Sequence, residues 1–262
     1  MRILLVILTA TSGVLALTSC KQAPKQENAN TAAKTTPEIE IVADRFADIQ
    51  MLRYTIPGFE ELSLPQKQLA YYLYMAGMSG RDIFYDQKNR YNLQIRKTLE
   101  TILETYQGDK NEDNYKKFMV YAKRFFFSNG IHHHYSTDKM IPEFDPAFLD
   151  TLISKSDYSK MPNEGKKIEE FISFLKPILF DPKLDAKGVS LAADVDNVKA
   201  SSSNLYENVT QKEVEQFYKN KILPGVKEQP SWGLNSKVMK VNGKIEEQVW
   251  KSGGMYGAAI DK

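Results

Sequence analysis

The residues of this chain that could carry chemistry are few, and three of them are adjacent. The sequence holds three histidines, His132, His133 and His134, and one cysteine, Cys20. Zinc sites use Cys and His ligands at characteristic spacings, and the chain has no Cys-x-x-Cys or His-x-x-x-His spacing. It also has no Gly-x-Ser-x-Gly nucleophile motif and no Gly-rich phosphate loop. The residues alone therefore predict no complete catalytic apparatus and no metal site built wholly within this chain.

The histidines follow an Asn129-Gly130 pair, which predicts a sharp turn after a helix. In an extended segment His132 and His134 would point to one side and His133 to the other. Two imidazoles on one side could bind a metal with carboxylates from elsewhere, or form a polar wall for peptide groups or a substrate's charged end. They could equally be buried, hydrogen-bonded structural residues. The residues leave these three hypotheses open.

The composition is that of an ordinary soluble globular protein. The 262 residues include 35 Lys and Arg against 33 Asp and Glu, and 42% of them are hydrophobic. A net charge of +2 provides no basic face for phosphate contacts, so we expect no nucleic-acid partner.

The first twenty residues have the pattern of a bacterial lipoprotein signal peptide. A basic Arg2 precedes an apolar run, residues 3–17, that is shorter than the roughly 20 residues needed to span a bilayer. The run ends in Leu-Thr-Ser-Cys, which resembles a lipobox, so we expect lipidation at Cys20 and attachment to a membrane of the bacterial cell envelope, in the periplasm or outer membrane. The alternative is a secreted protein with an incidental cysteine. Residues 21–45 are polar and predict a flexible linker.

The sequence predicts that most of the elements that position the three histidines are helices. Apolar residues at helical spacing predict a helix from Ser63 to a stop at Gly80 and two more over 95–106 and 115–126, each with its apolar stripe in the core. Arg81 and Asp82 are expected to form an ion pair at the end of the first helix. Three further helices are predicted after Asp145-Pro146, over 168–175 before a bend or end at Pro177, and after the capping residue Thr210.

Strand signals come late in the chain. Residues 238–250 read as a hairpin around Asn242-Gly243, and residues 181–208 as a loop. We expect cross-strand ion pairs on a solvated face, formed by Lys237, Lys240, Lys244, Glu246 and Glu247. The predicted fold class is therefore α+β, mainly helical, with a late hairpin that belongs to an incomplete sheet or barrel.

Seven stretches occur in the order found in one known family. They are QMLRY (50–54), PGFE (57–60), GRDI (80–83), RKTLE (96–100), SNGIHHHY (128–135), WGLNSK (232–237) and GGMY (253–256). Together they resemble the dipeptidyl peptidase III family, specifically its bacterial lipoprotein-like branch, and the resemblance covers nearly everything from Phe46 onward. It implies a two-lobed zinc exopeptidase that releases dipeptides from peptide N-termini, with residues 46–262 as an incomplete N-terminal part in the lower lobe.

The resemblance also says where the zinc of such an enzyme is held. The family binds it through an H-E-x-x-G-H helix and a downstream Glu in an E-E-x-x-A segment, and this sequence has neither motif. No zinc ligand can therefore be assigned here, and zinc is expected only in the full-length family protein. Residues 253–260 read as a loop entering a very short helix, which adds to the expectation of a fragment that is inactive alone.

In the family, the segment that matches 129–135 borders the pocket for the N-terminal end of the peptide substrate. The resemblance thus implies Tyr135 as an aromatic wall, with Asn129, His132 and His134 as polar neighbours. An alternative function is a non-catalytic envelope lipoprotein that binds peptides without cutting them. A third is a purely structural envelope protein.

Overall fold

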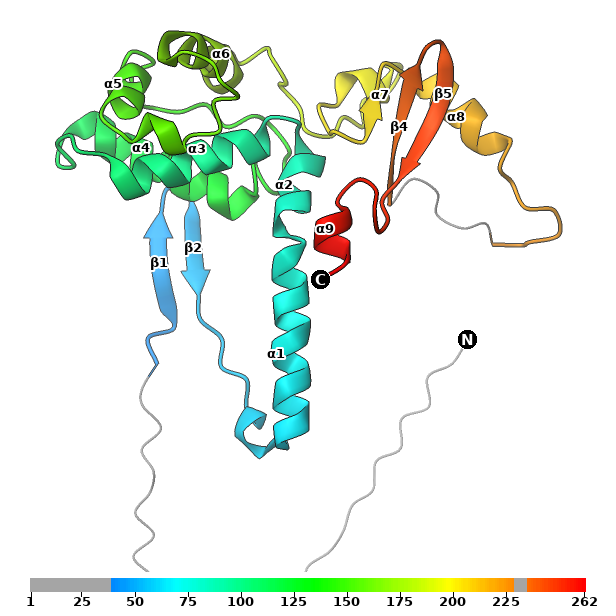
Figure 1. Cartoon of the computed structure of the whole chain (residues 1–262), viewed down its shortest axis with the longest axis horizontal. Coiled ribbons are helices and arrows are strands. Elements are labelled where there is room, and N and C mark those ends of the chain that lie inside the picture. The colour runs from blue at the N-terminus through cyan, green and yellow to red at the C-terminus, as the bar shows by residue number, and fades with distance from the viewer. Residues whose placement is uncertain (1–38, 229–234) are drawn as a thin grey trace, which may run out of the picture. The chain divides into compact units, whose positions relative to one another are not determined.

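Helices dominate the residues that this computed structural model describes, which are 39–228 and 235–262. Residues 40–262 form one compact unit. The α+β prediction is confirmed, with two small sheets beside the helices (Figure 1). The predicted signal peptide 1–20, with Cys20, lies outside the described residues, as does most of the predicted linker 21–45. In the described part of the chain, no helix combines the length and the apolar character needed to cross a membrane.

Four helices build the main core. They are α3 (Asn92–Thr105), α4 (Asp113–Ser128), α5 (Phe148–Ser154) and α6 (Ile168–Phe180). The apolar stripes predicted on α3 and α4 are buried in one hydrophobic cluster, as expected for amphipathic helices. Aromatic rings pack against one another in that cluster: Phe118 meets Phe144 edge-on, with ring centroids 5.9 Å apart.

Pro177 does not end its helix. α6 continues past it to Phe180, and the chain leaves the helix at Asp181. Pro lacks an N–H and cannot donate within a helix, yet Phe171, Leu175, Ile178 and Leu179 on the same helix are buried. Burial of that apolar face stabilises the helix beyond the proline.

The first predicted helix exists, but its predicted core position is wrong. α1 (Leu64–Ser79) begins with the expected capping box, in which the Ser63 N–H donates to Gln66 Oε1 at 2.9 Å. None of its residues is buried, and Leu69, Tyr72 and Leu73 are each about 60% exposed or more. Tyr71, Tyr74 and Met75 are also exposed, so the helix is apolar around its whole circumference and has no single face to bury.

The predicted stop of the first helix at Gly80 is confirmed, because α1 ends at Ser79 with Gly80 as its C-cap, but a second helix follows at once. The φ of Gly80, −80°, is right-handed, and α2 (Arg81–Lys88) starts directly after it. The predicted ion pair between Arg81 and Asp82 is wrong, because Asp82 pairs with Arg96 of α3 at 2.5 Å. Arg96 is buried and also binds Glu100, so this contact fastens α2 to the helical core.

A short hairpin that the sequence did not predict precedes α1. β1 (Val42–Phe46) pairs antiparallel with β2 (Ile49–Leu52). β1 thus occupies the last residues of the predicted linker 21–45. Phe46 is buried and meets the ring of Phe127 edge-on. A short 3₁₀ turn, Phe59–Glu61, lies between this hairpin and α1.

The second sheet has the strand order β3-β4-β5. The predicted hairpin is confirmed as β4 (Ser236–Val241) and β5 (Lys244–Val249), and Asn242 and Gly243 have the positive φ angles that the turn requires. β3 (Tyr206–Glu207) adds parallel to β4. β3 was missed because it is two residues long and lies in the predicted loop 181–208, which also contains the short α7 (Asn197–Ala200).

Lys237 and Lys240 find partners outside the hairpin, and among the described residues no ion pair joins β4 to β5, so the predicted cross-strand ion pairs are wrong. Lys237 is buried and pairs with Glu207 of β3 at 2.5 Å. Lys240 pairs at 2.5 Å with Glu213, which belongs to α8 (Gln211–Lys219). Thr210 caps this helix, as predicted. Glu247 accepts from Tyr218 of the same helix, so these pairs bind α8 to the sheet.

The described chain includes two further short elements. One is a 3₁₀ turn, Tyr158–Lys160, whose Tyr158 packs against the main core. The other is α9 (Gly257–Ile260), the brief small-residue helix that the sequence predicts.

The predicted apolar stripe of α4 is buried and that of α1 is exposed, so mutations on the two helices should change stability by different amounts. Phe118→Ala empties a fully buried site and should lower the free energy of unfolding by about 3–5 kcal/mol. Leu69→Ala on α1 removes a side chain that is 59% exposed and should change it by less than about 0.5 kcal/mol. Urea denaturation followed by circular dichroism measures both. A loss above 2 kcal/mol for Leu69→Ala would contradict the exposed position of α1.

Candidate functional site

The three histidines line one cavity of about 240 Å³. This cavity, called here the histidine cavity, is bounded by α2, by residues 131–138, called the His segment, and by residues 181–205, called the loop before β3. Its lining residues are Phe84, Gln87, Lys88, His132, His133, His134, Thr137, Gly188, Val189, Ser203 and Leu205.

A tight turn after α4 aims the His segment at the cavity. Asn129 ends the helix in the left-handed region with a φ of 54°, and Gly130 follows with a φ of 142°. The next residue, Ile131, is fully buried, and its N–H donates to Asn92 Oδ1 at 3.0 Å. A Cβ on Gly130 would lie 2.1 Å from Asn92 Nδ2, so only glycine allows this approach.

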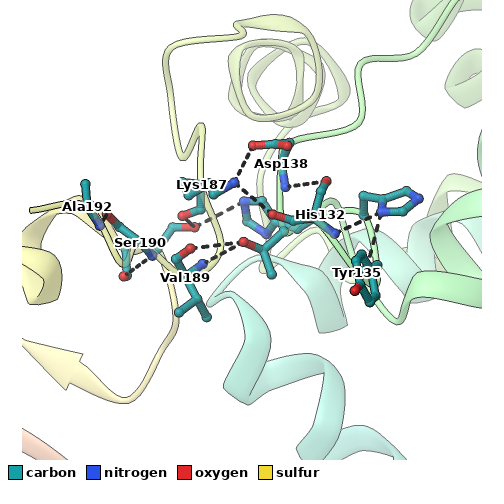
Figure 2. A network of polar contacts seen from close by, with 12 residues as sticks. His132, Tyr135, Asp138, Lys187, Val189, Ser190 and Ala192 are labelled. Carbon is teal, nitrogen blue, oxygen red and sulfur yellow. Dashed lines mark hydrogen bonds and ion pairs between the residues drawn. The ribbon is translucent and has the colours of Figure 1, made fainter.

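His132 is buried at the centre of a polar network (Figure 2). Its Nε2 lies 2.7 Å from the backbone carbonyl of Asp185 and 3.2 Å from Ser202 Oγ. Because a carbonyl oxygen can only accept, Nε2 carries the proton and donates to it. Nδ1 is buried without a hydrogen-bond partner among the described residues. Burial lowers the pKa of His132, against the opposing effect of the Asp185 hydrogen bond, so the ring is neutral at pH 7.

The same network fixes the segments on either side of His132. The side chain of Asn89, which is fully buried, donates through Nδ2 to Asp185 Oδ2 at 2.8 Å. Lys187 reaches Asp138 at 2.6 Å and also donates to the backbone of the His segment, as the dashed lines in Figure 2 show. The hydrogen bond to Lys187 lowers the pKa of Asp138. These contacts join α2 and the loop before β3 to the His segment.

The segment is not extended, so the predicted alternation of the three rings is wrong. The chain turns after His133, whose Nδ1 accepts from the N–H groups of Tyr135 and Ser136. The rings of His133 and His134 lie together, with centroids 4.3 Å apart, and His134 rests edge-on against Phe127. Desolvation first, and then the neighbouring His133, lower the pKa of His134.

The four residues implied by the resemblance are not all brought together. His132 and His134 line the histidine cavity, whereas Asn129 and Tyr135 do not. Asn129 forms the helix end, and Tyr135 is 88% exposed on the turn. The aromatic residue that lines the cavity is Phe84 on α2.

Sequence reasoning missed the residues that α2 and the loop before β3 contribute. Phe84 and Lys88 are four residues apart and share a helix face, a signal that was available once α2 was recognised. Lys88 donates to the Ser128 carbonyl at 2.7 Å, at the negative end of α4, and burial lowers its pKa. Ser203 and Leu205 carried no local signal, because only tertiary packing brings them here.

The described residues do not fit a zinc site. Among them, no group of three or more His, Cys, Asp or Glu side chains is arranged to hold a metal ion. His132 Nε2 is committed to the Asp185 carbonyl, and His133 Nδ1 accepts two backbone N–H groups. The cavity offers imidazoles, hydroxyls and apolar walls, which suit an organic ligand.

No protein-family model matches the chain, and no curated protein matches its sequence.

The turn at Gly130 should be sensitive to a single methyl group. Gly130→Ala combines a disfavoured φ with overlap on Asn92, so the free energy of unfolding should fall by about 2–4 kcal/mol. Gly165→Ala is the matched control: its φ is also positive, but nothing lies within 4 Å of the added Cβ, so about 1 kcal/mol is expected. Thermal denaturation compares the two. Equal losses would show that Asn92 does not press against Gly130.

His132 should make stability depend on pH. Its pKa is lower in the folded than in the unfolded chain, so below pH 6.5 the unfolded chain binds more protons. The free energy of unfolding should therefore fall as the pH decreases from 7 to 5, by up to about 1.4 kcal/mol per unit from this group. His132→Gln should flatten that slope, and His134→Gln, on an exposed ring, should retain most of it. Urea titrations at several pH values test this, and identical slopes for all three proteins would contradict it.

Proposed function

We propose that this chain supplies the peptide-binding part of a dipeptidyl peptidase III-like zinc exopeptidase, and that it does not hydrolyse peptides alone. The resemblance of seven ordered stretches supports the family, and the missing H-E-x-x-G-H motif supports the lack of activity. Under this proposal the zinc and its ligands belong to polypeptide other than this chain. Lipidation at Cys20 would hold the protein on a membrane of the bacterial cell envelope.

The histidine cavity is the observation that carries the proposal. Its volume of about 240 Å³ is smaller than that of a typical drug-sized pocket and accommodates one or two residues of a peptide. Phe84, Val189 and Leu205 provide apolar contact for a side chain, and Gln87, Thr137 and Ser203 provide donors and acceptors for peptide groups.

The charge of the cavity sets how a peptide end would bind. No carboxylate is among its lining residues, and its one lysine, Lys88, donates to the Ser128 carbonyl at 2.7 Å. Outside the lining, Asp48 lies 3.9 Å from His133 Nε2. A peptide's N-terminal ammonium would therefore be held by neutral acceptors, including the imidazole of His134. Protonation of that imidazole would repel the ammonium, so binding should weaken as the pH falls through the histidine range.

The second candidate is a non-catalytic envelope lipoprotein that binds peptides without cutting them. The same cavity favours it, since none of the contacts above requires a metal. The two candidates differ in what they demand of the ligand. A dipeptidyl peptidase must recognise a free N-terminus, whereas a general peptide binder has no need of one.

Calorimetry on the purified chain can test both candidates. Tetra-alanine should bind, and Phe84→Ala should weaken its binding about tenfold through the lost apolar contact. Phe59→Ala removes another exposed ring, outside the cavity, and should leave binding unchanged. N-acetylated tetra-alanine should bind at least tenfold more weakly if the exopeptidase proposal holds, and equally well if the general binder is correct.

The proposed lack of activity needs a separate measurement. The chain incubated with zinc should neither retain the metal stoichiometrically nor release the amine from a dipeptidyl arylamide. Turnover together with tightly bound zinc would refute the proposed dependence on other polypeptide. Absence of peptide binding at millimolar concentrations would refute both candidate functions.

A further inference from the structure

A second cavity, of about 680 Å³, lies outside the histidine cavity and shares only Ser203 with its lining. Its volume is within the range of small-molecule sites, about 300–1,000 Å³. The walls come from the turn between α2 and α3, from α7 and the serines after it, from the β3 region and from β4. This cavity, called here the serine cavity, includes in its lining Arg90, Tyr91, Asp185, Lys199, Ser203 and Tyr206.

The charges of the serine cavity are only partly balanced. Lys240 pairs with Glu213 at 2.5 Å, which neutralises both. The carboxylate of Asp185 accepts from Asn89, a neutral amide. Arg90 and Lys199 are exposed, and no ion pair or side-chain hydrogen bond joins either of them to another described residue. Outside the lining, the hydrogen bond from Lys237 lowers the pKa of Glu207, and the charge of Arg90 lowers it further. Among the lining residues, two cations without an ion-pair partner and one carboxylate leave one positive charge in excess.

Hydroxyl groups add directional donors to this charge. Ser201 and Ser202 use their hydroxyls to bind backbone carbonyls, so these two residues are held in place. The hydroxyls of Ser203, Tyr91 and Tyr206 have no hydrogen-bond partner among the described residues. The Tyr91 ring is itself held edge-on by Phe174, with centroids 5.7 Å apart. The cavity thus combines two cations with three hydroxyls that have no partner among the described residues, and neighbouring contacts hold the Tyr91 ring and the serines in place.

We propose that the serine cavity binds a small organic carboxylate. Arg90 and Lys199 pair with the carboxylate, and the free hydroxyls hydrogen-bond to polar groups on the rest of the ligand. An excess of one charge matches a monoanion better than a phosphate dianion. The carboxylate is either the C-terminus of a short peptide or that of a sugar acid. This site does not depend on the proposed peptidase relationship.

Calorimetry with paired probes tests the site on the full chain. The charged probes are glucuronate and tri-alanine, and their neutral counterparts are glucose and tri-alanine amide. Each acid should bind at least tenfold more tightly than its counterpart, or only one acid should do so, which then identifies the source. Arg90→Gln should weaken that binding about tenfold, whereas Arg81→Gln, an exposed arginine outside both cavities, should not.

Phe84→Ala separates this site from the histidine cavity. Binding at the serine cavity should be unaffected by Phe84→Ala and reduced by Arg90→Gln, and the opposite pattern would overturn the proposal. Equal binding of acids and neutral counterparts would also overturn it, as would no binding at 10 mM. Binding of inorganic phosphate with neither acid would indicate an adventitious ion only and would equally overturn it.

Discussion

The position of Asp185 is the constraint on which both cavities depend. Its backbone carbonyl accepts the His132 proton, and its carboxylate accepts from Asn89, so one residue with a φ of 52° links the His segment to α2. His132 and Asn89 are both buried, and a buried polar group left without a partner costs about 1–3 kcal/mol. These contacts hold the loop before β3 against the helical core, together with contacts from Ser202 to both buried side chains. That loop forms walls of both cavities.

The helical core and the small sheet use different kinds of interaction. In the core, aromatic and aliphatic side chains on α3 to α6 exclude water, and this burial is largely non-directional. Around the sheet the apolar cluster is small, with Val209, Val214 and Val238 buried, and ion pairs such as Lys237–Glu207 carry the contacts between elements. The partly charged surroundings of the serine cavity follow from this arrangement. The histidine cavity, which lies beside α2, has apolar walls because it borders the helical core.

Much of the local structure was predictable, and the site only in part. Capping residues such as Ser63 and Thr210 gave correct helix starts, because a cap satisfies N–H groups within four residues of chain. The Asn242-Gly243 turn was predictable for the same local reason. Among the residues singled out from the sequence, His132 and His134 line a cavity, while the sequence did not point to Phe84 and Ser203. Phe84 and Ser203 are each more than forty positions away from the His segment in the sequence, so only the fold brings them to the cavity.

By itself, then, the sequence determined the helix periodicities, the caps, the tight turns, and the set of side chains from which any chemistry must be drawn. The tertiary structure alone decided which apolar stripes are buried, leaving α1 exposed while α3 and α4 form the core. It also decided that His132 turns inward to Asp185 and that Lys240 pairs with Glu213 instead of its own hairpin. The physical reason is the range of the interactions: caps and turns are satisfied within a few residues, whereas burial and ion pairing depend on which distant segments meet.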